Sequence, residues 1–215
     1  MTILCFASGK GGTGKTTNAA QLAERRIAAG RRVLMIDTDR QGSLALWASQ
    51  RISAGKPAIP CISLFGENLS NQVLEFAPKY DDIVIDTRGT EAGNVEMYEA
   101  LTIANVIVSP IRTSLFDAAT TIDLSKTMRI IRRVNRDVKA FMLLNDVSTH
   151  PHSKRDAEIR EQLADLPEFN GVLKTQISHR TVFERVAEMG MSAAEFGGDP
   201  KATAEVTALA EEVWQ

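Results

Sequence analysis

The segment at residues 9–17, with the sequence GKGGTGKTT, constrains this chain more than any other feature. It satisfies the pattern G-x-x-x-x-G-K-[ST], follows an apolar run at residues 3–7, and precedes a helix-forming stretch. Glycines let the backbone curl so that successive N–H groups point at phosphate oxygens, and the helix N-terminus adds partial positive charge. The segment therefore predicts a phosphate-binding loop, or P-loop. The residues expected to bind phosphate are Gly11, Gly12, Thr13, Gly14, Lys15, Thr16 and Thr17.

Two side chains of this loop have specific expected roles. Lys15 is expected to place its ammonium near the β- and γ-phosphates, and the Thr16 hydroxyl is expected to ligate Mg²⁺. A glycine-rich turn without a ligand is the alternative, but it gives no reason for the strand before the loop and the helix after it.

Short apolar runs alternate with helical segments along the whole chain. The runs are continuous, which is typical of strands that are covered on both faces of a parallel sheet. Strands are expected at 3–7, 33–36, 61–65, 83–85, 106–108, 140–144 and 172–177. Helices are expected at 15–29, 42–53, 69–77, 94–104, 117–135, 154–163, 181–189 and 202–214. This alternation predicts an α/β fold in a single domain of residues 1–215: a doubly wound, mostly parallel sheet with helices on both faces.

Composition excludes several classes of protein. Of the 215 residues, 44% are hydrophobic and 24% are charged, which is ordinary for a globular chain and argues against disorder. Cys5 and Cys61 are too few for a disulfide framework or a cysteine metal site. No charged leader precedes an apolar stretch, and no apolar run approaches 18 residues, so a cytoplasmic protein is expected. The net charge of -2 means that any nucleic-acid site must be a local basic patch.

Carboxylates follow two of the expected strands. Asp37 and Asp39 come after the run at 33–36, and Asp86 comes after the run at 83–85. In open α/β sheets, ligands bind beyond the carboxyl ends of the strands. Such carboxylates can hold Mg²⁺ or position a water molecule, although helix capping is an alternative role for aspartate. The metal site is therefore predicted at Thr16, Asp37 and Asp86.

Residues 10–17, KGGTGKTT, resemble the deviant Walker A box K-G-G-x-G-K-T-T of the ParA/MinD/Soj family of P-loop ATPases. Residues 37–42, DTDRQG, resemble the D-x-D-P-Q-G element of the same family, with Arg40 in place of its usual proline. The resemblance extends over nearly the whole chain. Because the first strand starts at once, with no N-terminal helix-turn-helix, the chain is similar to the small, ParF-like type of ParA.

The resemblance implies ATP and Mg²⁺ as cofactors and assigns catalytic residues. Lys10 would contact the nucleotide of the partner subunit in a sandwich dimer, Lys15 would bind phosphate, and Asp39 would orient the attacking water. Asp37 would support the magnesium site. For the adenine base, the resemblance points to Pro110 and Asn145 at the ends of two strands, although Asn145 could equally cap a loop.

One predicted helix carries a basic stripe. At about 100° per residue, Lys126, Arg129, Arg133 and Arg136 fall within an arc of roughly 80°. The apolar residues opposite them are Leu124, Met128, Ile131 and Val134. A solvated charged face and binding of DNA phosphates both fit such a stripe, and the resemblance favours DNA. A similarity to the family's C-terminal I-P-R-x-x-R region adds Arg180 and Arg185 as expected DNA contacts.

The resemblance implies an ATP-dependent homodimer that binds DNA non-specifically. A ParB-like adaptor would stimulate its slow ATPase activity, and repeated cycles would partition plasmid or chromosome DNA, or position another cargo, over the nucleoid. A MinD-like positioning ATPase at the membrane is an alternative, but Glu205, Glu211 and Glu212 in a tail without Lys or Arg argue against membrane association. A metabolic P-loop enzyme is a second alternative, and neither cluster-forming cysteines nor an added substrate domain supports it.

Overall fold

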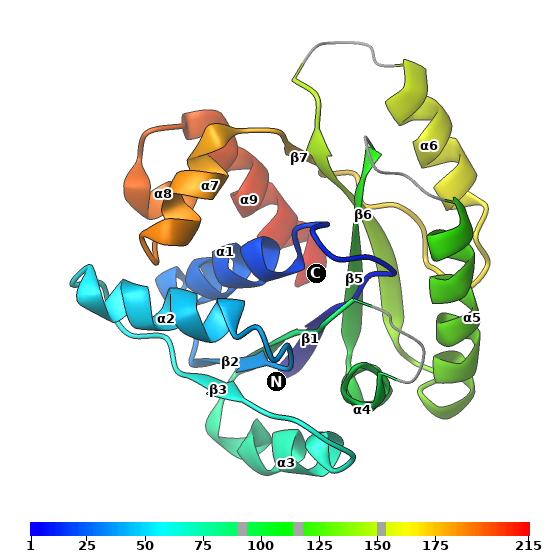
Figure 1. Ribbon diagram of the computed structural model, residues 1–215, viewed down its shortest axis with the longest axis horizontal. Helices are drawn as coiled ribbons and strands as arrows, with labels where there is room; N and C mark the ends of the chain where they lie inside the picture. The colour runs from blue at the N-terminus through cyan, green and yellow to red at the C-terminus, as the bar shows by residue number, and fades with distance from the viewer. Residues whose placement is uncertain (90–93, 114–117, 150–153) are drawn as a thin grey trace.

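A parallel β-sheet runs through the middle of the molecule (Figure 1). The computed structural model describes residues 1–89, 94–113, 118–149 and 154–215. Within these residues the sheet has seven strands in the order β3-β2-β4-β1-β5-β6-β7, and every pairing is parallel. The strands are β1 Thr2–Phe6, β2 Val33–Asp37, β3 Cys61–Ser63, β4 Asp82–Asp86, β5 Val106–Arg112, β6 Lys139–Val147 and β7 Ile177–Ser178. Six of the seven expected strands are confirmed; in place of the strand expected at 172–177, β7 is a two-residue edge strand at Ile177–Ser178, and Val172 forms an isolated bridge with Met142.

The helices follow the expected pattern with small shifts at their ends. They are α1 Lys15–Ala28, α2 Ser43–Ser53, α3 Leu69–Phe76, α4 Val95–Ile103, α5 Ala118–Val134, α6 Lys154–Ala164, α7 Thr181–Glu188 and α9 Pro200–Val213. Residue 117, the expected start of the fifth helix, lies outside the described residues. Two short elements were not expected, η1 Ala77–Lys79 and α8 Ala193–Phe196. Each is too short to show a helical repeat in the sequence.

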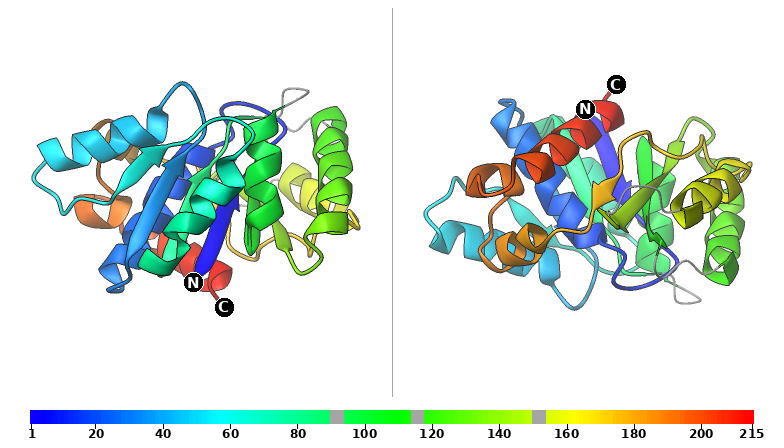
Figure 2. Two further views of the ribbon diagram at one scale, coloured as in Figure 1. Left: turned by 90° about the horizontal axis from the view of Figure 1, so that it is seen from below. Right: turned by 90° about the horizontal axis from the view of Figure 1, so that it is seen from above.

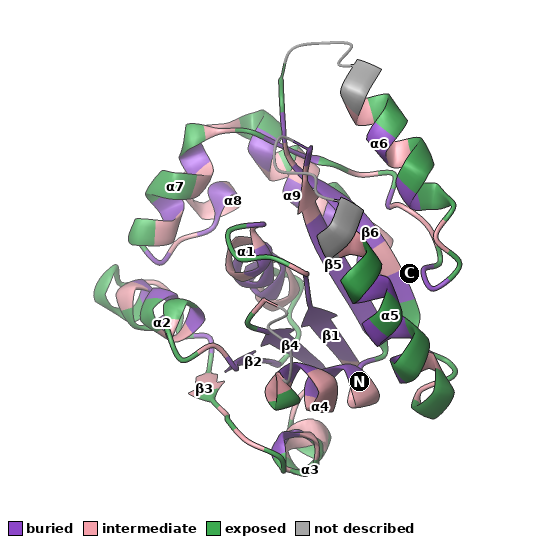
Figure 3. Cartoon of the chain, turned by 45° about the vertical axis from the view of Figure 1, so that its right-hand side comes forward, coloured by how far each residue is buried: buried purple, intermediate pink, exposed green. Residues whose placement is uncertain are grey.

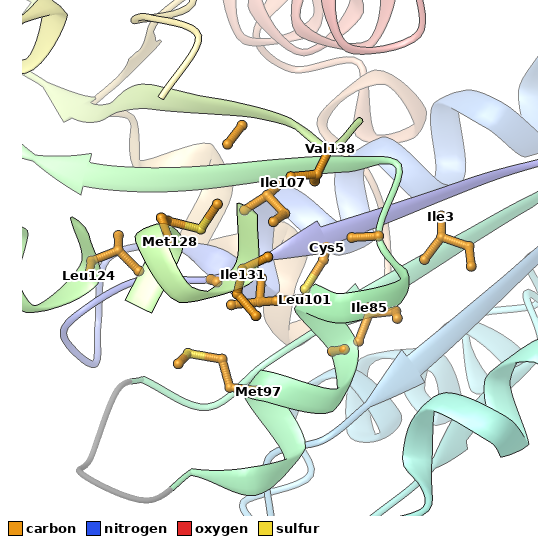
Figure 4. Packing of buried hydrophobic residues seen from close by; sticks show 14 of the residues in the cluster. Ile3, Cys5, Ile85, Met97, Leu101, Ile107, Leu124, Met128, Ile131 and Val138 are labelled. Atoms are coloured by element: carbon orange, nitrogen blue, oxygen red, sulfur yellow. The ribbon is translucent and has the colours of Figure 1, made fainter. Parts of the chain in front are cut away.

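Helices cover both faces of the sheet (Figure 2), because alternate strand residues point to opposite sides. In β1, Ile3 and Cys5 face α3, α4, α5 and α6, whereas Leu4 and Phe6 face α1, α2 and α9. Figure 4 shows the first of these cores, in which side chains from α4 and α5 meet those of the sheet. The core residues labelled there are Ile3, Cys5, Ile85, Met97, Leu101, Ile107, Leu124, Met128, Ile131 and Val138.

The chain changes direction within the sheet next to β1. The helix α1 leads from β1 across β4 to β2, whereas α4 leads from β4 across β1 to β5. A crevice is expected where the connections diverge in this way, beyond the carboxyl ends of the strands. The P-loop follows β1 directly, so the topology places it in that crevice.

A buried ion pair fixes α7 and α8 against α2. The guanidinium of Arg51, on α2, is 1% exposed and donates two hydrogen bonds to Glu195 at 2.6 and 2.7 Å. Gly190 lies against the same segment with φ +63°, and a Cβ there would come within 2.1 Å of the Arg51 backbone nitrogen. Only glycine fits this approach. The Arg51–Glu195 pair therefore fixes α8, and with it α7, against α2, and α2 and α7 line one side of the crevice.

Candidate nucleotide-binding site

The P-loop has the backbone that its glycines predict. Gly12 and Gly14 adopt left-handed conformations, with φ of +72° and +97°, and α1 begins at Lys15. Gly14 also packs tightly, because a Cβ at this position would lie 2.2 Å from the Asn145 amide nitrogen. The loop therefore ends at the N-terminus of a 14-residue helix, where a phosphate would meet free N–H groups and a positive dipole.

The Lys15 ammonium is held inside the loop. It is 7% exposed and donates to the Ser8 hydroxyl at 3.0 Å and to the Lys10 carbonyl at 3.3 Å. Burial lowers the pKa of Lys15, while the charges of Asp86 and Asp39 act in the opposite direction. A phosphate oxygen is a stronger acceptor than a hydroxyl or a carbonyl, so the ammonium can exchange these partners for a bound phosphate.

Thr16 and Asp86 form the pair expected for a metal. The Thr16 hydroxyl donates to Asp86 Oδ2 at 2.5 Å, and Asp86 is 1% exposed. Its other oxygen, Oδ1, is buried and has no hydrogen-bond partner within the described part of the chain. A buried acceptor of this kind needs a partner, and oxygen ligands are those that Mg²⁺ prefers. These residues therefore fit Mg²⁺.

The Asp37 carboxylate accepts backbone hydrogen bonds on both of its oxygens. Its Oδ2 accepts the backbone N–H groups of Leu44 and Ala45 at 2.9 and 3.0 Å, and its Oδ1 accepts that of Asp39 at 3.0 Å. Both carboxylate oxygens are thus engaged by the backbone at the start of α2. In the structure Asp37 fixes the start of α2 and the loop that carries Asp39, and its support of the magnesium site stays a prediction.

Asp39 lies in the crevice as expected. Its Oδ1 accepts the backbone N–H of Gln41 at 3.0 Å, and its side chain lines the same cavity as Lys15. Arg40, which replaces the family's proline, points elsewhere: its guanidinium lies over the Phe65 ring at 4.9 Å. This cation–π contact ties the outer side of the loop to the segment after β3, so the loop is anchored without proline.

The loop after β4 touches the P-loop. A Cβ on Gly89 would lie 3.0 Å from the Lys10 carbonyl carbon and 3.1 Å from the Gly11 nitrogen. The absence of a side chain at residue 89 permits this approach. Arg88 and Gly89 both line the cavity, and Lys10 is exposed at its rim. Because the two loops are in contact here, a movement of one would displace the other.

These loops enclose a cavity of about 900 Å³. One end is formed by the P-loop, Asp39 and Arg88, and the other by α2 and α7, with Leu46, Trp47 and Ala187 among the lining residues. A second hollow of about 310 Å³ opens beside Gly12 and Gly14, on the β6 side of the P-loop. The far end of the first cavity mixes apolar residues with Gln50 and Glu188.

The two expected adenine contacts have different positions. Asn145 lines the second hollow, and its side-chain nitrogen donates to the Thr13 carbonyl at 2.8 Å while its oxygen accepts from Asn18 at 3.1 Å. It therefore supports the P-loop. Pro110 is buried within β5, which continues to Arg112 instead of ending at the proline as expected. Pro110 is not among the residues that line either cavity.

Sequence reasoning missed a charged cluster at the second hollow. Arg112 donates to the Gly12 carbonyl at 3.3 Å and pairs with Asp146, whose other oxygen lies 2.6 Å from His179 Nδ1. Asp146 has φ +59°, an uncommon conformation for a residue other than glycine. The signal that could have found the cluster is its position, since Arg112 and Asp146 stand at the carboxyl ends of adjacent strands.

Comparison with known proteins identifies the family. Residues 4–192 match the model of the CobQ/CobB/MinD/ParA nucleotide binding domain. The chain belongs to this family. The septum site-determining protein MinD of Pyrococcus horikoshii, solved with Mg-ADP, is 20% identical with a TM-score of 0.74; the match covers 99% of this chain and 95% of the MinD chain. An aspartate-to-alanine variant of McdA from Cyanothece, solved with ATP, is 14% identical with a TM-score of 0.78; the match covers 100% of this chain and 96% of the McdA chain.

A curated relative matches over a shorter stretch. The maintenance of carboxysome distribution protein A of Gloeobacter kilaueensis is 46% identical over 52 residues. This stretch is 24% of the present chain and 24% of that relative. The two solved structures share the fold of this MinD/ParA-family chain, and the expected doubly wound sheet is thereby confirmed.

The buried Asp86 of this family member predicts a pH-dependent stability. Burial raises the pKa of the Asp86 carboxyl to about 7, although the Thr16 hydrogen bond and the Lys15 charge act in the opposite direction. Between about pH 4 and pH 7 the folded chain keeps a proton that the unfolded chain releases. The free energy of unfolding of metal-free protein should therefore fall as the pH rises through this range, by on the order of 4 kcal/mol.

Urea unfolding in EDTA at about pH 5 and pH 8 measures this effect. Asp86→Asn removes the titrating group, so the variant should lose less stability than the original protein between the two pH values. Mg²⁺ with ATP should restore stability at the higher pH, because the metal favours the ionised carboxylate. Equal losses in both proteins would contradict the buried carboxylate as the cause.

The basic stripe on α5 is only partly free. Lys126 pairs with Asp123 at 2.8 Å, and Arg129 pairs with Glu168 at 2.6 Å. Arg133 and Arg136 are exposed, and neither makes an ion pair with another described residue, but Arg136 lies beyond Val134, where α5 ends, and so is not part of the helix. The apolar face opposite was also predicted one residue too long: Leu124, Met128 and Ile131 are buried, but Val134 is 68% exposed. Val134 ends the helix and lies well outside the arc of the other three.

Of the two C-terminal arginines, one is paired with carboxylates and the other is exposed. The Arg180 side chain is largely buried between Glu205 and Asp199, and its guanidinium lies 2.8 and 3.4 Å from their carboxylates, so its charge is already paired within the protein. Arg185 is exposed and lies over the Phe196 ring at 5.0 Å. Of the six cations expected to bind DNA, Arg180 is the one whose position the structure makes unsuitable.

Proposed function

We propose that this chain is an ATP-driven positioning switch that binds ATP with Mg²⁺, dimerises on ATP and hydrolyses it slowly. One observation carries the proposal: Lys15, Thr16 and Asp39 line a single cavity at the P-loop, and the Thr16 hydroxyl donates to the buried Asp86 directly behind it. Lys15 would bind phosphate, and Thr16 and Asp86 would hold Mg²⁺, which supplies charge neutralisation at the phosphates when bound. Asp39 would orient the water.

The second hollow supports a position for the nucleobase. It adjoins Gly12 and Gly14 and is lined by Asn145, Asp146 and His179. A base there would lie beside the P-loop, on the side away from Asp39. We assign no base contact to Pro110, because that residue is buried in β5.

The dimer proposal rests on Lys10. This lysine is exposed at the rim of the cavity, where a second subunit facing the P-loop would meet it. The Lys10 backbone lies against Gly89, so binding of Lys10 to a nucleotide in the partner subunit would also affect the position of the loop after β4. The proposed partner that stimulates hydrolysis is a ParB-like adaptor.

We further propose that the ATP-bound dimer binds duplex DNA non-specifically and thereby associates with the nucleoid. Arg133, Arg136 and Arg185 are exposed, and Lys126 pairs with the exposed Asp123. An exposed ion pair contributes little stability, so a DNA phosphate can replace the Asp123 carboxylate, whereas Arg129 stays paired with the buried Glu168. Phosphate contacts from such a stripe need no base reading.

The cargo is proposed to be plasmid or chromosome DNA. The match to a carboxysome distribution protein supports a protein microcompartment as a second candidate. A MinD-like membrane role has less support, because the apolar residues of α9 are packed in the core. Across residues 1–89, 94–113, 118–149 and 154–215, no helix combines the length and apolarity needed to span a bilayer.

Fluorescence anisotropy with a labelled non-specific duplex tests the proposal, measured with ATP, with ADP and without nucleotide across a salt series. Binding should require ATP and weaken steeply with salt. Arg133→Glu/Arg136→Glu should weaken binding at least about tenfold and reduce the slope of log K against log salt by about 2. The control, Lys79→Glu/Lys201→Glu, changes net charge equally at exposed lysines on η1 and α9.

Two results would contradict the proposal. An unchanged affinity in the Arg133/Arg136 variant would exclude the C-terminal end of α5 and the turn after it as the DNA face. ATP hydrolysis without DNA binding in any nucleotide state would exclude the DNA-riding switch and leave the nucleotide site intact.

A further inference from the structure

The outer face of α5 carries exposed aliphatic side chains as well as cations. Ile122, Ile130 and Val134 are 52%, 50% and 68% exposed. With Lys126 they occupy every fourth position from residue 122 to residue 134, which on an α-helix forms one continuous ridge. Figure 3 shows α5 at an edge of the molecule, with exposed residues on the side away from the sheet.

A second ridge runs beside the first. Arg129 and Arg133 are also four residues apart, and each lies within about 60° of Lys126 around the helix axis. The groove between an aliphatic and a cationic ridge is the shape into which a ridge of another helix packs. With 17 residues, α5 is about 25 Å long, so it can receive about four turns of such a helix.

Solvation alone accounts poorly for this face. Single exposed hydrophobic residues are common on protein surfaces, but three branched aliphatic residues on one ridge make a row about 18 Å long. DNA phosphates also give no reason for the row, because they need cations and gain nothing from isoleucine and valine. The apolar row and the cations together match a ligand that is both apolar and anionic.

We propose that the outer face of α5 is a docking surface for an acidic amphipathic helix of a partner protein. Apolar side chains of that helix would pack along Ile122, Ile130 and Val134, and its carboxylates would face Lys126, Arg129 and Arg133. A second copy of α5 is a poor occupant, since its cations would face like charges. The proposal requires neither DNA binding nor a particular cargo.

A designed peptide probes this surface directly. The probe is a fluorescein-labelled, 18-residue helical peptide with leucine at every third or fourth position and glutamate beside the leucines. Its control is a scrambled peptide of the same composition, which has the same charge but no apolar stripe. Anisotropy titrations should show binding of the amphipathic peptide and at least tenfold weaker binding of the scrambled one.

Substitutions on α5 separate the apolar contribution from the charge. Ile130→Ser/Val134→Ser should weaken peptide binding about tenfold or more, while Ile52→Ser, an isoleucine 62% exposed on α2, should have no effect. Arg133→Glu should weaken binding of both the peptide and duplex DNA, whereas the aliphatic pair should leave DNA binding unchanged. Because the substituted aliphatic side chains are exposed, thermal unfolding should be nearly unaltered, which confirms that the variants fold.

Three results would overturn the proposal. They are equal binding of both peptides, unchanged peptide affinity in the aliphatic variant, and light scattering that shows self-association of the chain lost in that variant. The last would assign the face to a second copy. Loss of ATP hydrolysis is not expected in any α5 variant, so a failure of the nucleotide site would be seen separately.

Discussion

Lys15→Ala is expected to abolish detectable ATP binding. The ammonium is almost fully buried at the P-loop, where its present acceptors are one hydroxyl and one carbonyl. A charge-assisted hydrogen bond contributes about 1.5–3 kcal/mol, and Lys15 is placed to make more than one to the phosphates. The dissociation constant should therefore rise at least about a hundredfold in titration calorimetry with Mg²⁺ and ATP.

Lys10→Ala is the matched control for this experiment. Lys10 belongs to the same loop, but it is exposed at the cavity rim and is proposed to reach the nucleotide of a second subunit. This variant should retain ATP binding while losing ATP-dependent dimerisation in light scattering. Folding should survive in Lys15→Ala, because the Ser8 hydroxyl keeps partners at the Lys10 carbonyl and at Thr13. Unaltered ATP affinity in Lys15→Ala would overturn the assignment of the phosphate site.

The sequence predicted those parts of the site that depend on local pattern. The P-loop needs glycines at fixed spacing between a strand and a helix, and Asp39 and Asp86 follow short, continuous apolar runs that are typical of buried strands. Parallel strands bring their carboxyl ends to one edge, so the order of the elements places Asp39 and Asp86 beside the P-loop that carries Lys15.

Side-chain partners distant in sequence could not be predicted in the same way. Arg129 looked free because its partner, Glu168, lies 39 residues away, and Arg180 looked free because Glu205 reaches it from α9. Asp37 illustrates a different difficulty. Capping and metal binding use the same carboxylate at the same strand end, and only the positions of the Leu44 and Ala45 N–H groups distinguish them.

Asp39→Ala should retain ATP binding and ATP-dependent dimerisation but reduce turnover at least about a hundredfold, the size of effect typical for loss of a positioned acid–base group. Asp39 lines the cavity near Lys15, and the hydrogen bond that its carboxylate accepts comes from Gln41 in its own loop. Its removal should therefore leave the phosphate and metal residues in place. Phosphate release measured beside ATP affinity separates the two effects.

Asp39→Asn sharpens this experiment. The amide oxygen of asparagine can still accept the Gln41 N–H, so the loop keeps its turn while the negative charge is lost. If charge orients the attacking water, both variants should be slow; if the turn alone matters, the asparagine variant should be nearly as fast as the original. Asp37→Asn gives the contrast, because it disturbs a buried cap of α2 and should lower the unfolding midpoint as well as the rate. An unchanged rate in both Asp39 variants would contradict Asp39 as the residue that orients the water.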